Sequence, residues 1–140
     1  MSTIHFFSEK VKFKLANPRK TRTWIGQVVK QEGKELGEIN IIFCSDTFLL
    51  QLNQSHLNHD TLTDIITFDY TEGPKSALSG DIFISIHRVK ENASKFEVPL
   101  DSELHRVIIH GILHLIGYKD KTTSQKSTMR GKEDAYLSLR

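Results

Sequence analysis

Residues 104–120, LHRVIIHGILHLIGYKD, constrain the fold of the 140-residue chain more than any other stretch. At about 100° per residue, His110 and His114 lie one turn apart on the same face of a helix, so both imidazoles can reach one metal ion. Gly117 follows where a helix can end on a residue that accepts a positive φ. The chain can then turn back and bring Asp120 to the same point. The pattern H-x-x-x-H-x-x-G-x-x-D therefore predicts a metal site with two ligands from a helix and one from the following loop.

The apolar residues of this stretch predict that the helix is buried. They surround it on almost every side, and they are Leu104, Val107, Ile108, Ile109, Ile112, Leu113, Leu115 and Ile116. A single histidine in such a helix is typically a hydrogen-bonded core residue. Two histidines four residues apart, followed by a glycine and a carboxylate at these offsets, favour a metal site instead.

The same spacing occurs in a zinc-protease motif, H-E-x-x-H-x-x-G-x-x-H, with two differences. Gly111 stands where those proteases have the glutamate that acts as general base, and Asp120 stands at the third ligand position. The geometry for a metal is kept and the base for peptide hydrolysis is absent. The absence of this base argues against a different metallohydrolase, such as a peptidase, which stays an alternative enzyme class.

The composition indicates one globular domain over residues 1–140. Charged residues make up 26% of the chain and hydrophobic residues 38%, which is typical of a domain able to bury a core. The single cysteine, Cys44, excludes an internal disulfide and predicts a buried thiol. No apolar run approaches the roughly 20 residues needed to cross a bilayer, and the first ten residues lack a signal-peptide pattern. We therefore expect a cytoplasmic protein without a membrane partner.

The formal net charge of +2 is too small to identify a nucleic-acid-binding protein. Basic residues form two clusters, and such clusters are usually solvated faces. The second cluster adjoins the predicted metal site, where phosphates would need electrostatic partners. The first cluster is Lys10, Lys12, Lys14, Arg19, Lys20 and Arg22; the second is Lys119, Lys121, Lys126, Arg130 and Lys132.

Hydrophobic periodicity predicts four strands and five helices in the order β-α-β-α-β-β-α-α-α. The strands are expected at residues 3–7, 38–44, the end of 60–70, and 81–86, and the helices at 18–33, 46–58, 87–96, 101–116 and 125–139. Asn17, Asp46, and either Asp101 or Ser102 are expected to cap helices.

Two early strand-helix-strand units favour parallel pairing, and a hairpin adds an antiparallel strand. The predicted fold class is α/β (α+β): a mixed sheet of about four strands covered by helices, with a central buried helix that carries the metal ligands.

Residues 110–118, HGILHLIGY, resemble the signature of the YbeY family, bacterial zinc-dependent endoribonucleases of ribosomal RNA maturation. The family pattern HGxLHLxGYDH supplies three histidines to one zinc. This chain matches it through Tyr118, then has Lys119 in place of Asp and Asp120 in place of the third histidine. Further matching blocks lie at 52–70, at 80–85 (GDIFIS), and at Met129 with Glu133. Leu57 stands where the family usually has an arginine thought to act on RNA phosphate.

The resemblance implies a metal-dependent single-strand endoribonuclease that acts in ribosomal RNA processing and ribosome maturation. The implied cofactor is one Zn²⁺ per chain held by His110, His114 and Asp120, although the carboxylate also suits manganese or nickel. The implied partners are single-stranded or ribosomal RNA and the ribosome or its proteins.

Catalytic candidates are of two kinds. Lys119, Lys121 or Arg130 could neutralise phosphate in place of the missing arginine, and ordinary surface cations are the alternative. His59 or His56 could contact RNA or supply a proton, and solvated loop residues are the alternative.

A non-enzymatic possibility also stays open. The chain could be a ribosome-associated zinc-binding module in which protein groups fill every ligand position and the metal only braces the fold.

Overall fold

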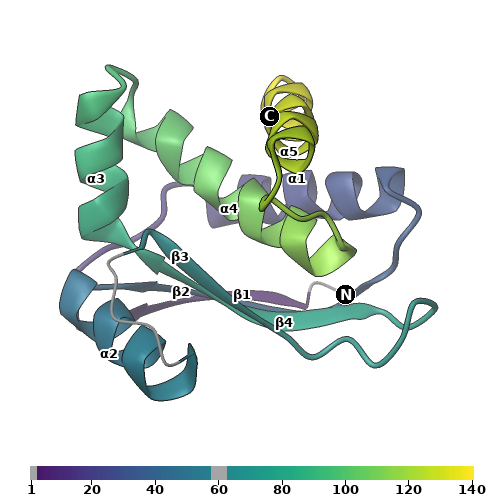
Figure 1. Ribbon diagram of the computed structural model, residues 1–140, viewed down its shortest axis with the longest axis horizontal. Coiled ribbons are helices and arrows are strands. Elements are labelled where there is room, and N and C mark those ends of the chain that lie inside the picture. Colours follow the sequence, from purple (N-terminus) through teal and green to yellow (C-terminus); the bar gives the residue numbers. More distant parts are fainter. Residues whose placement is uncertain (1–2, 58–62) are drawn as a thin grey trace.

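The computed structural model describes residues 3–57 and 63–140. Within these ranges the elements are β1 (Ile4–Glu9), α1 (Pro18–Gln31), β2 (Leu36–Cys44), α2 (Asp46–Leu57), β3 (Ile65–Asp69), β4 (Leu78–Ser85), α3 (Ile86–Lys95), α4 (Leu100–Ile116) and α5 (Thr123–Leu137). Their order is the predicted one. Figure 1 shows α1, α4 and α5 on one face of the sheet and α2 on the other, so the predicted mixed sheet covered by helices is confirmed.

The four described strands form one sheet in the order β1-β2-β4-β3. β1 and β4 both run parallel to β2, and β3 pairs antiparallel with β4. Parallel pairing is therefore correct for the first strand-helix-strand unit and wrong for the second, because β4 lies between β2 and β3 and β3 runs antiparallel to it. β4 takes the inner place since most of its residues are buried, whereas β3 buries only one of its five.

The core lies between the sheet and the layer of α1 and α4. Ile82 and Ile84 of β4 and Ile108 and Ile112 of α4 are fully buried in one cluster. Gly111 lets α4 approach the sheet closely, since a Cβ at this position would meet side-chain atoms of Ile82 at 3.0 Å. A bulkier residue would push the helix and its two histidines away from the sheet. Cys44 is buried as predicted.

Two of the predicted helix caps are wrong. Ser45 caps α2, since its Oγ accepts a hydrogen bond from the backbone N of Phe48 at 3.1 Å, and Asp46 lies one residue inside the helix. α4 begins at Leu100, directly after Pro99, with Asp101 in its first turn. Pro99 has an extended backbone and no N–H, so it ends the preceding loop without a polar cap.

The third capping position is only half right. Asn17 occupies the expected position before Pro18, but its backbone is left-handed and its side chain makes no capping hydrogen bond. α5, by contrast, starts with a capping box between Thr122 and Gln125. In the described part of the chain, no helix combines the length and apolarity that spanning a membrane requires.

Candidate metal centre

The last turns of α4 and the loop after it bring the three predicted metal ligands together. His110 and His114 project from one face of α4, which ends at Ile116. Gly117 has a φ of 126°, and the backbone N of Tyr118 donates to the carbonyl of Leu113 at 3.0 Å. This reversal directs residue 120 back toward the helix, as the position of the glycine predicts.

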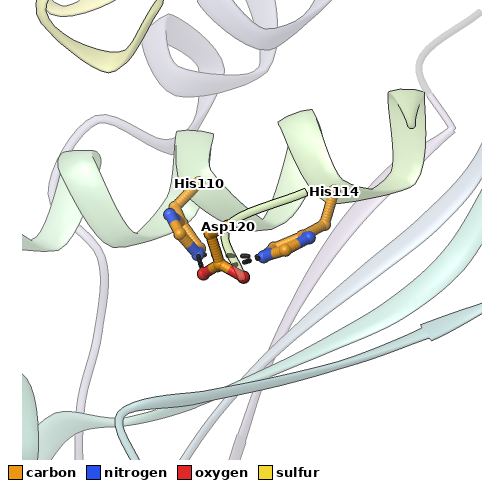
Figure 2. Close-up of side chains that lie close together, drawn as sticks. All are labelled: His110, His114 and Asp120. Carbon is orange, nitrogen blue, oxygen red and sulfur yellow. Dashed lines mark hydrogen bonds and ion pairs between the residues drawn. The ribbon is translucent and has the colours of Figure 1, made fainter. Parts of the chain in front are cut away.

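The three side chains converge on one point (Figure 2). Asp120 Oδ2 lies 3.2 Å from His110 Nε2 and 3.5 Å from His114 Nε2, and the two Nε2 atoms are 3.0 Å apart. Donors about 2 Å from a shared tetrahedral ion lie about 3.3 Å from each other, and the three separations bracket that value. The donor set therefore fits a single divalent cation. Open catalytic zinc sites use three protein ligands in this way.

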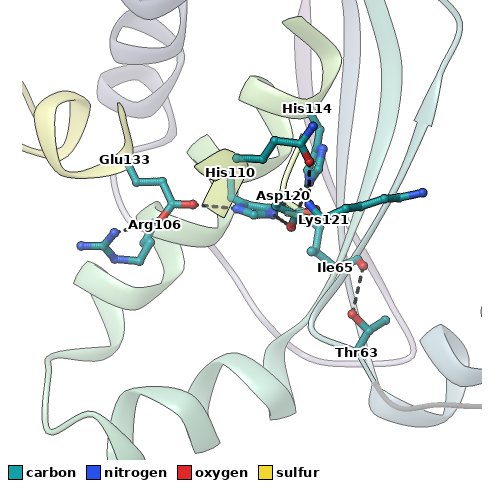
Figure 3. A network of polar contacts seen from close by, with 9 residues as sticks. Thr63, Ile65, Arg106, His110, His114, Asp120, Lys121 and Glu133 are labelled. Carbon is teal, nitrogen blue, oxygen red and sulfur yellow. Dashed lines mark hydrogen bonds and ion pairs between the residues drawn. The ribbon is translucent and has the colours of Figure 1, made fainter. Parts of the chain in front are cut away.

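Glu133 of α5 fixes the orientation of His110 (Figure 3). Its Oε2 accepts a hydrogen bond from His110 Nδ1 at 2.6 Å, and its Oε1 accepts one from Arg106 at 2.8 Å. Arg106 also donates to Asp134 at 2.6 Å. With the proton of His110 held on Nδ1, the Nε2 lone pair faces Asp120 and is free to bind a metal.

The role of Glu133 is missing from the sequence prediction, in which it appears only within a family pattern. A signal was present. Met129, Glu133 and Tyr136 are the buried residues of α5, and their spacing places them on one helix face. A carboxylate in an otherwise apolar stripe requires a partner, and here the partners are His110 and Arg106.

The pKa values of the two histidines are shifted in opposite directions. Burial lowers the pKa of His110, but the hydrogen bond that His110 donates to Glu133 and the charges of Glu133, Asp120 and Asp64 outweigh it, so the pKa is raised. For His114, burial and the positive charge of His110 lower the pKa. Two imidazoles whose Nε2 atoms face each other cannot both hold a proton there. The lowered pKa of His114 favours its neutral form, which is the form that binds a metal.

A cavity of about 390 Å³ opens beside the ligands, between α3, α4 and α5. Its walls include the predicted residue Arg130, together with His110, Asp120 and Lys126. Phe96, which is 56% exposed, also lines it. Arg106 lines it too, paired with Glu133 and Asp134. The arrangement therefore places three cations and an aromatic ring around a space that reaches the metal ligands.

The other catalytic candidates are distributed differently. Lys119 and Lys121 are described but do not belong to the walls of this cavity. His59 lies outside the described residues, and nothing is described of the side chains of His56 and Leu57. Asp64 lines the cavity, and burial raises its pKa.

A second polar network anchors the loop that carries Asp120. The Tyr118 hydroxyl donates to Glu32 Oε1 at 2.7 Å, and Lys132 Nζ donates to Glu32 Oε2 at 3.0 Å. Tyr136 also donates to Glu32. Burial raises the pKa of Glu32, but these donors outweigh it and the pKa is lowered. The loop is thus tied to both α1 and α5.

His105 has a structural environment. Its Nδ1 donates to the Asp101 carbonyl at 2.8 Å, and Thr21 Oγ1 donates to its Nε2 at 3.0 Å. Both ring nitrogens of this buried residue are therefore satisfied by the fold.

Fold and site together define a class: α+β proteins with a helix-borne histidine pair, a returning carboxylate, and a cavity beside them. Residues 3–139 match the family model described as Endoribonuclease YbeY. An Endoribonuclease YbeY of Cytophaga hutchinsonii is 54% identical over 138 residues, 99% of this chain and 96% of that one. One of Flavobacterium psychrophilum is 50% identical over 133 residues, 95% of this chain and 94% of that one. The chain belongs to the Endoribonuclease YbeY family.

A solved structure agrees with this assignment. The solution structure of TM1509 from Thermotoga maritima matches with a TM-score of 0.66 and 28% identity, covering 96% of this chain and 87% of that chain. The resemblance predicted from residues 110–118 is confirmed.

Proposed function

We propose that this protein, acting as one domain over residues 1–140, is a metal-dependent endoribonuclease that cleaves single-stranded RNA in ribosomal RNA processing. Membership of the Endoribonuclease YbeY family supports the activity and the substrate class. The observation that carries the proposal is the convergence of His110, His114 and Asp120 beside a cavity of about 390 Å³. We further infer that the substrate RNA is met on the ribosome or its precursors, in the cytoplasm.

One Zn²⁺ held by His110, His114 and Asp120 is the proposed cofactor. Two imidazoles and one carboxylate are donors that suit zinc, and the carboxylate also makes manganese or nickel acceptable. When bound, such a cation offsets charge on a phosphoryl oxygen and lowers the pKa of a neighbouring water. Glu133 supports this role by keeping the His110 Nε2 lone pair directed into the site.

Arg130 and Lys126 are the proposed phosphate partners. Both line the cavity that contains His110 and Asp120, and neither forms an ion pair with a described residue. With the metal bound, a phosphodiester next to the ligands would therefore have two unpaired cations beside it. This placement favours Arg130 over Lys119 as the substitute for the arginine that Leu57 replaces. A guanidinium also binds two phosphate oxygens at once, which orients the group as well as neutralising it.

Phe96 is the proposed contact for an RNA base. Single-stranded RNA presents unstacked bases, and exposed aromatic rings bind them by stacking. The exposed ring of Phe96 lines the same cavity, so one base could rest on it while the adjoining phosphate lies near the cations. His59 stays a candidate for RNA contact or proton transfer, to be tested by His59→Ala.

The decisive experiment compares metal-loaded wild type and His114→Ala on single-stranded and structured RNA. Replacing a residue that supports a metal ligand costs about 10–100-fold, so loss of a ligand itself should reduce cleavage by more than about 100-fold. His87→Ala is the matched control, because His87 is an exposed histidine outside the site. Equal cleavage by wild type and His114→Ala would remove the metal from the mechanism.

The same experiment tests the non-catalytic alternative. If wild type binds RNA without cutting it, and chelation unfolds the chain, the metal only braces a binding module. The three-ligand donor set favours the enzyme, since structural zinc sites are closed by four protein ligands.

A further inference from the structure

Positive charge is concentrated in one early segment of the chain. Residues 10–31 contain seven Lys and Arg and no Asp or Glu. The rest of the chain therefore carries twelve Lys and Arg against seventeen Asp and Glu. The overall charge of +2 conceals a strongly basic segment on an otherwise acidic protein, and such asymmetry is typical of a surface that binds a polyanion.

This segment lines two adjoining hollows away from the metal ligands. The larger, of about 780 Å³, is lined by Arg19, Lys20 and Arg22. The smaller, of about 260 Å³, shares Pro18 and Arg22 with it and adds Lys14 and Phe7. None of the described residues that line these two hollows is acidic. We call the two together the basic groove. Its cations are Lys14, Arg19, Lys20 and Arg22; Arg140 also lines the larger hollow but is paired with Asp101.

The fold leaves most of this charge available. Lys14, Arg19 and Lys20 are exposed, and among the described residues no carboxylate forms an ion pair with them. Arg22 is held in place without losing its charge, since its Nε donates to the carbonyl of Ile4 at 2.9 Å and its guanidinium lies over a phenylalanine ring. The groove therefore presents one anchored cation, Arg22, beside three exposed ones.

Two further features suit a nucleic acid. Phe7, at the edge strand β1, is 51% exposed and lines the smaller hollow, so it can stack against a base between phosphate contacts. The first residues of α1 also line the larger hollow, and no side chain caps this helix end, which carries a partial positive charge. Cations, an exposed ring and a helix amino terminus thus lie along one surface.

The basic groove and the metal centre lie on different sides of α4. α1 packs on α4 through Thr21 and His105, and Figure 1 shows α1 behind α4. His110 and Asp120 instead line the cavity between α3, α4 and α5. An RNA that occupied both places would have to extend well beyond the nucleotides next to the metal.

We propose that the basic groove binds the sugar-phosphate backbone of RNA outside the segment being cut. It anchors long ribosomal RNA on the enzyme, and most of its affinity comes from releasing the counterions of the phosphates. The inference rests on the proposed function for the identity of the RNA as substrate. Binding at the groove is separate from cleavage and can be measured without it.

The test neutralises two groove cations in the double variant Arg19→Gln with Lys20→Gln. The control is Lys75→Gln with Lys90→Gln, which changes the net charge equally at two exposed lysines outside the groove. Both pairs are placed in a His114→Ala background, so that RNA is not consumed. Affinity is measured at several salt concentrations for a ribosomal RNA fragment several tens of nucleotides long and for an oligonucleotide of about six, short enough for one site.

Each lost phosphate contact to a single strand lowers the salt slope by about 0.7, or about fivefold in affinity near 0.1 M salt. The groove variant should therefore bind the long RNA about 25-fold more weakly, with a slope about 1.4 shallower. The control pair should bind as the parent does, and in the metal-competent protein the groove variant should cleave the short oligonucleotide at the wild-type rate.

Three results would overturn the proposal: unchanged affinity for the long RNA, as expected if the groove receives an acidic protein; equal losses in the control pair; or equal losses on the short oligonucleotide. Failure of the proposed function has a different signature, since metal-loaded wild type would then cleave no RNA whatever the groove variant binds.

Discussion

Replacing Glu133 by glutamine should weaken metal binding although Glu133 is not a ligand. The carboxylate accepts from His110 Nδ1 at 2.6 Å with one oxygen and from Arg106 at 2.8 Å with the other. A glutamine amide has only one accepting oxygen. If that oxygen stays with Arg106, the amide N–H₂ faces His110, whose proton then moves to Nε2 and blocks the lone pair that a metal needs. If it turns to His110, two donors face each other at Arg106.

Either arrangement has a cost that can be estimated. Partners of metal-binding histidines typically contribute 10–100-fold in affinity, which is about 1.4–2.7 kcal/mol. The upper end applies here, because Glu133 is buried with its side chain only 6% exposed and the unwanted tautomer removes a ligand outright. At a metal concentration of 100 times the wild-type Kd, bound metal stabilises wild type by about 2.7 kcal/mol and a hundredfold weaker variant by about 0.4 kcal/mol.

The assay is metal affinity by competition with a chelator, together with denaturant unfolding with and without metal. Asp134→Asn is the control, since Asp134 pairs with the same Arg106 but, with a side chain 58% exposed, makes no contact with His110. It should leave metal affinity unchanged and cost at most about 1 kcal/mol of unfolding free energy. Equal metal affinity in Glu133→Gln and wild type, or equal losses in the two variants, would refute the tautomer argument.

Three other changes have defined outcomes. Tyr118→Phe removes a hydrogen bond to Glu32, so unfolding should become about 1.5–3 kcal/mol easier, with a smaller loss of metal affinity as the Asp120 loop loosens; denaturant titration and chelator competition measure both. Burial lowers the pKa of His105 below its ordinary value of 6.5, so the unfolded chain takes up the proton first and stability falls as pH drops below about 6.5. His105→Gln should make this pH dependence shallower by up to about 1.4 kcal/mol per pH unit. The measurement is the free energy of unfolding, taken in about three steps from about pH 8 to about pH 5. Phe96→Ala should raise KM for single-stranded RNA by about 5–150-fold, the equivalent of 1–3 kcal/mol of base stacking, with kcat unchanged; a kcat effect without a KM effect would contradict the base contact.

Local patterns predicted the elements of the fold, and long-range competition decided their arrangement. Periodicity along the chain placed the four strands and five helices in the correct order, because each period depends only on neighbouring residues. The place of β4 between β2 and β3 depends on which strand buries more of its surface in the assembled sheet. The predicted caps of α2 and α4 were wrong for a similar reason. Ser45 and Pro99 occupy the cap positions, and the polar residues expected there lie just inside each helix.

The site residues show the same difference between local and long-range relationships. His110, His114, Gly117 and Asp120 lie within eleven residues, so helix geometry and one turn suffice to relate them. Glu133 lies 23 residues from His110, and no spacing rule connects a helix to a later helix packed on it. The same is true of Glu32 and Tyr118, which are 86 residues apart. Arg130 could be proposed from its charge and position, but only the packing of α5 on α4 distinguishes it from Lys119.

The replacement of the family's third histidine by Asp120 changes the charge of the cavity and explains why cations matter there. The described walls carry four carboxylates and three Lys or Arg, a formal charge of about −1 with neutral His110 and every carboxylate ionised. A phosphodiester is repelled by such a cavity until a divalent cation reverses the sign. A histidine at position 120 would make the walls neutral before the metal binds. With Asp120 in place, attraction of phosphate depends more heavily on both the metal and the cations next to it, Arg130 and Lys126. The departure at position 120 therefore adds to the demand for a phosphate partner that Leu57 already creates, and Arg130 and Lys126 of α5 are the residues that we propose for it.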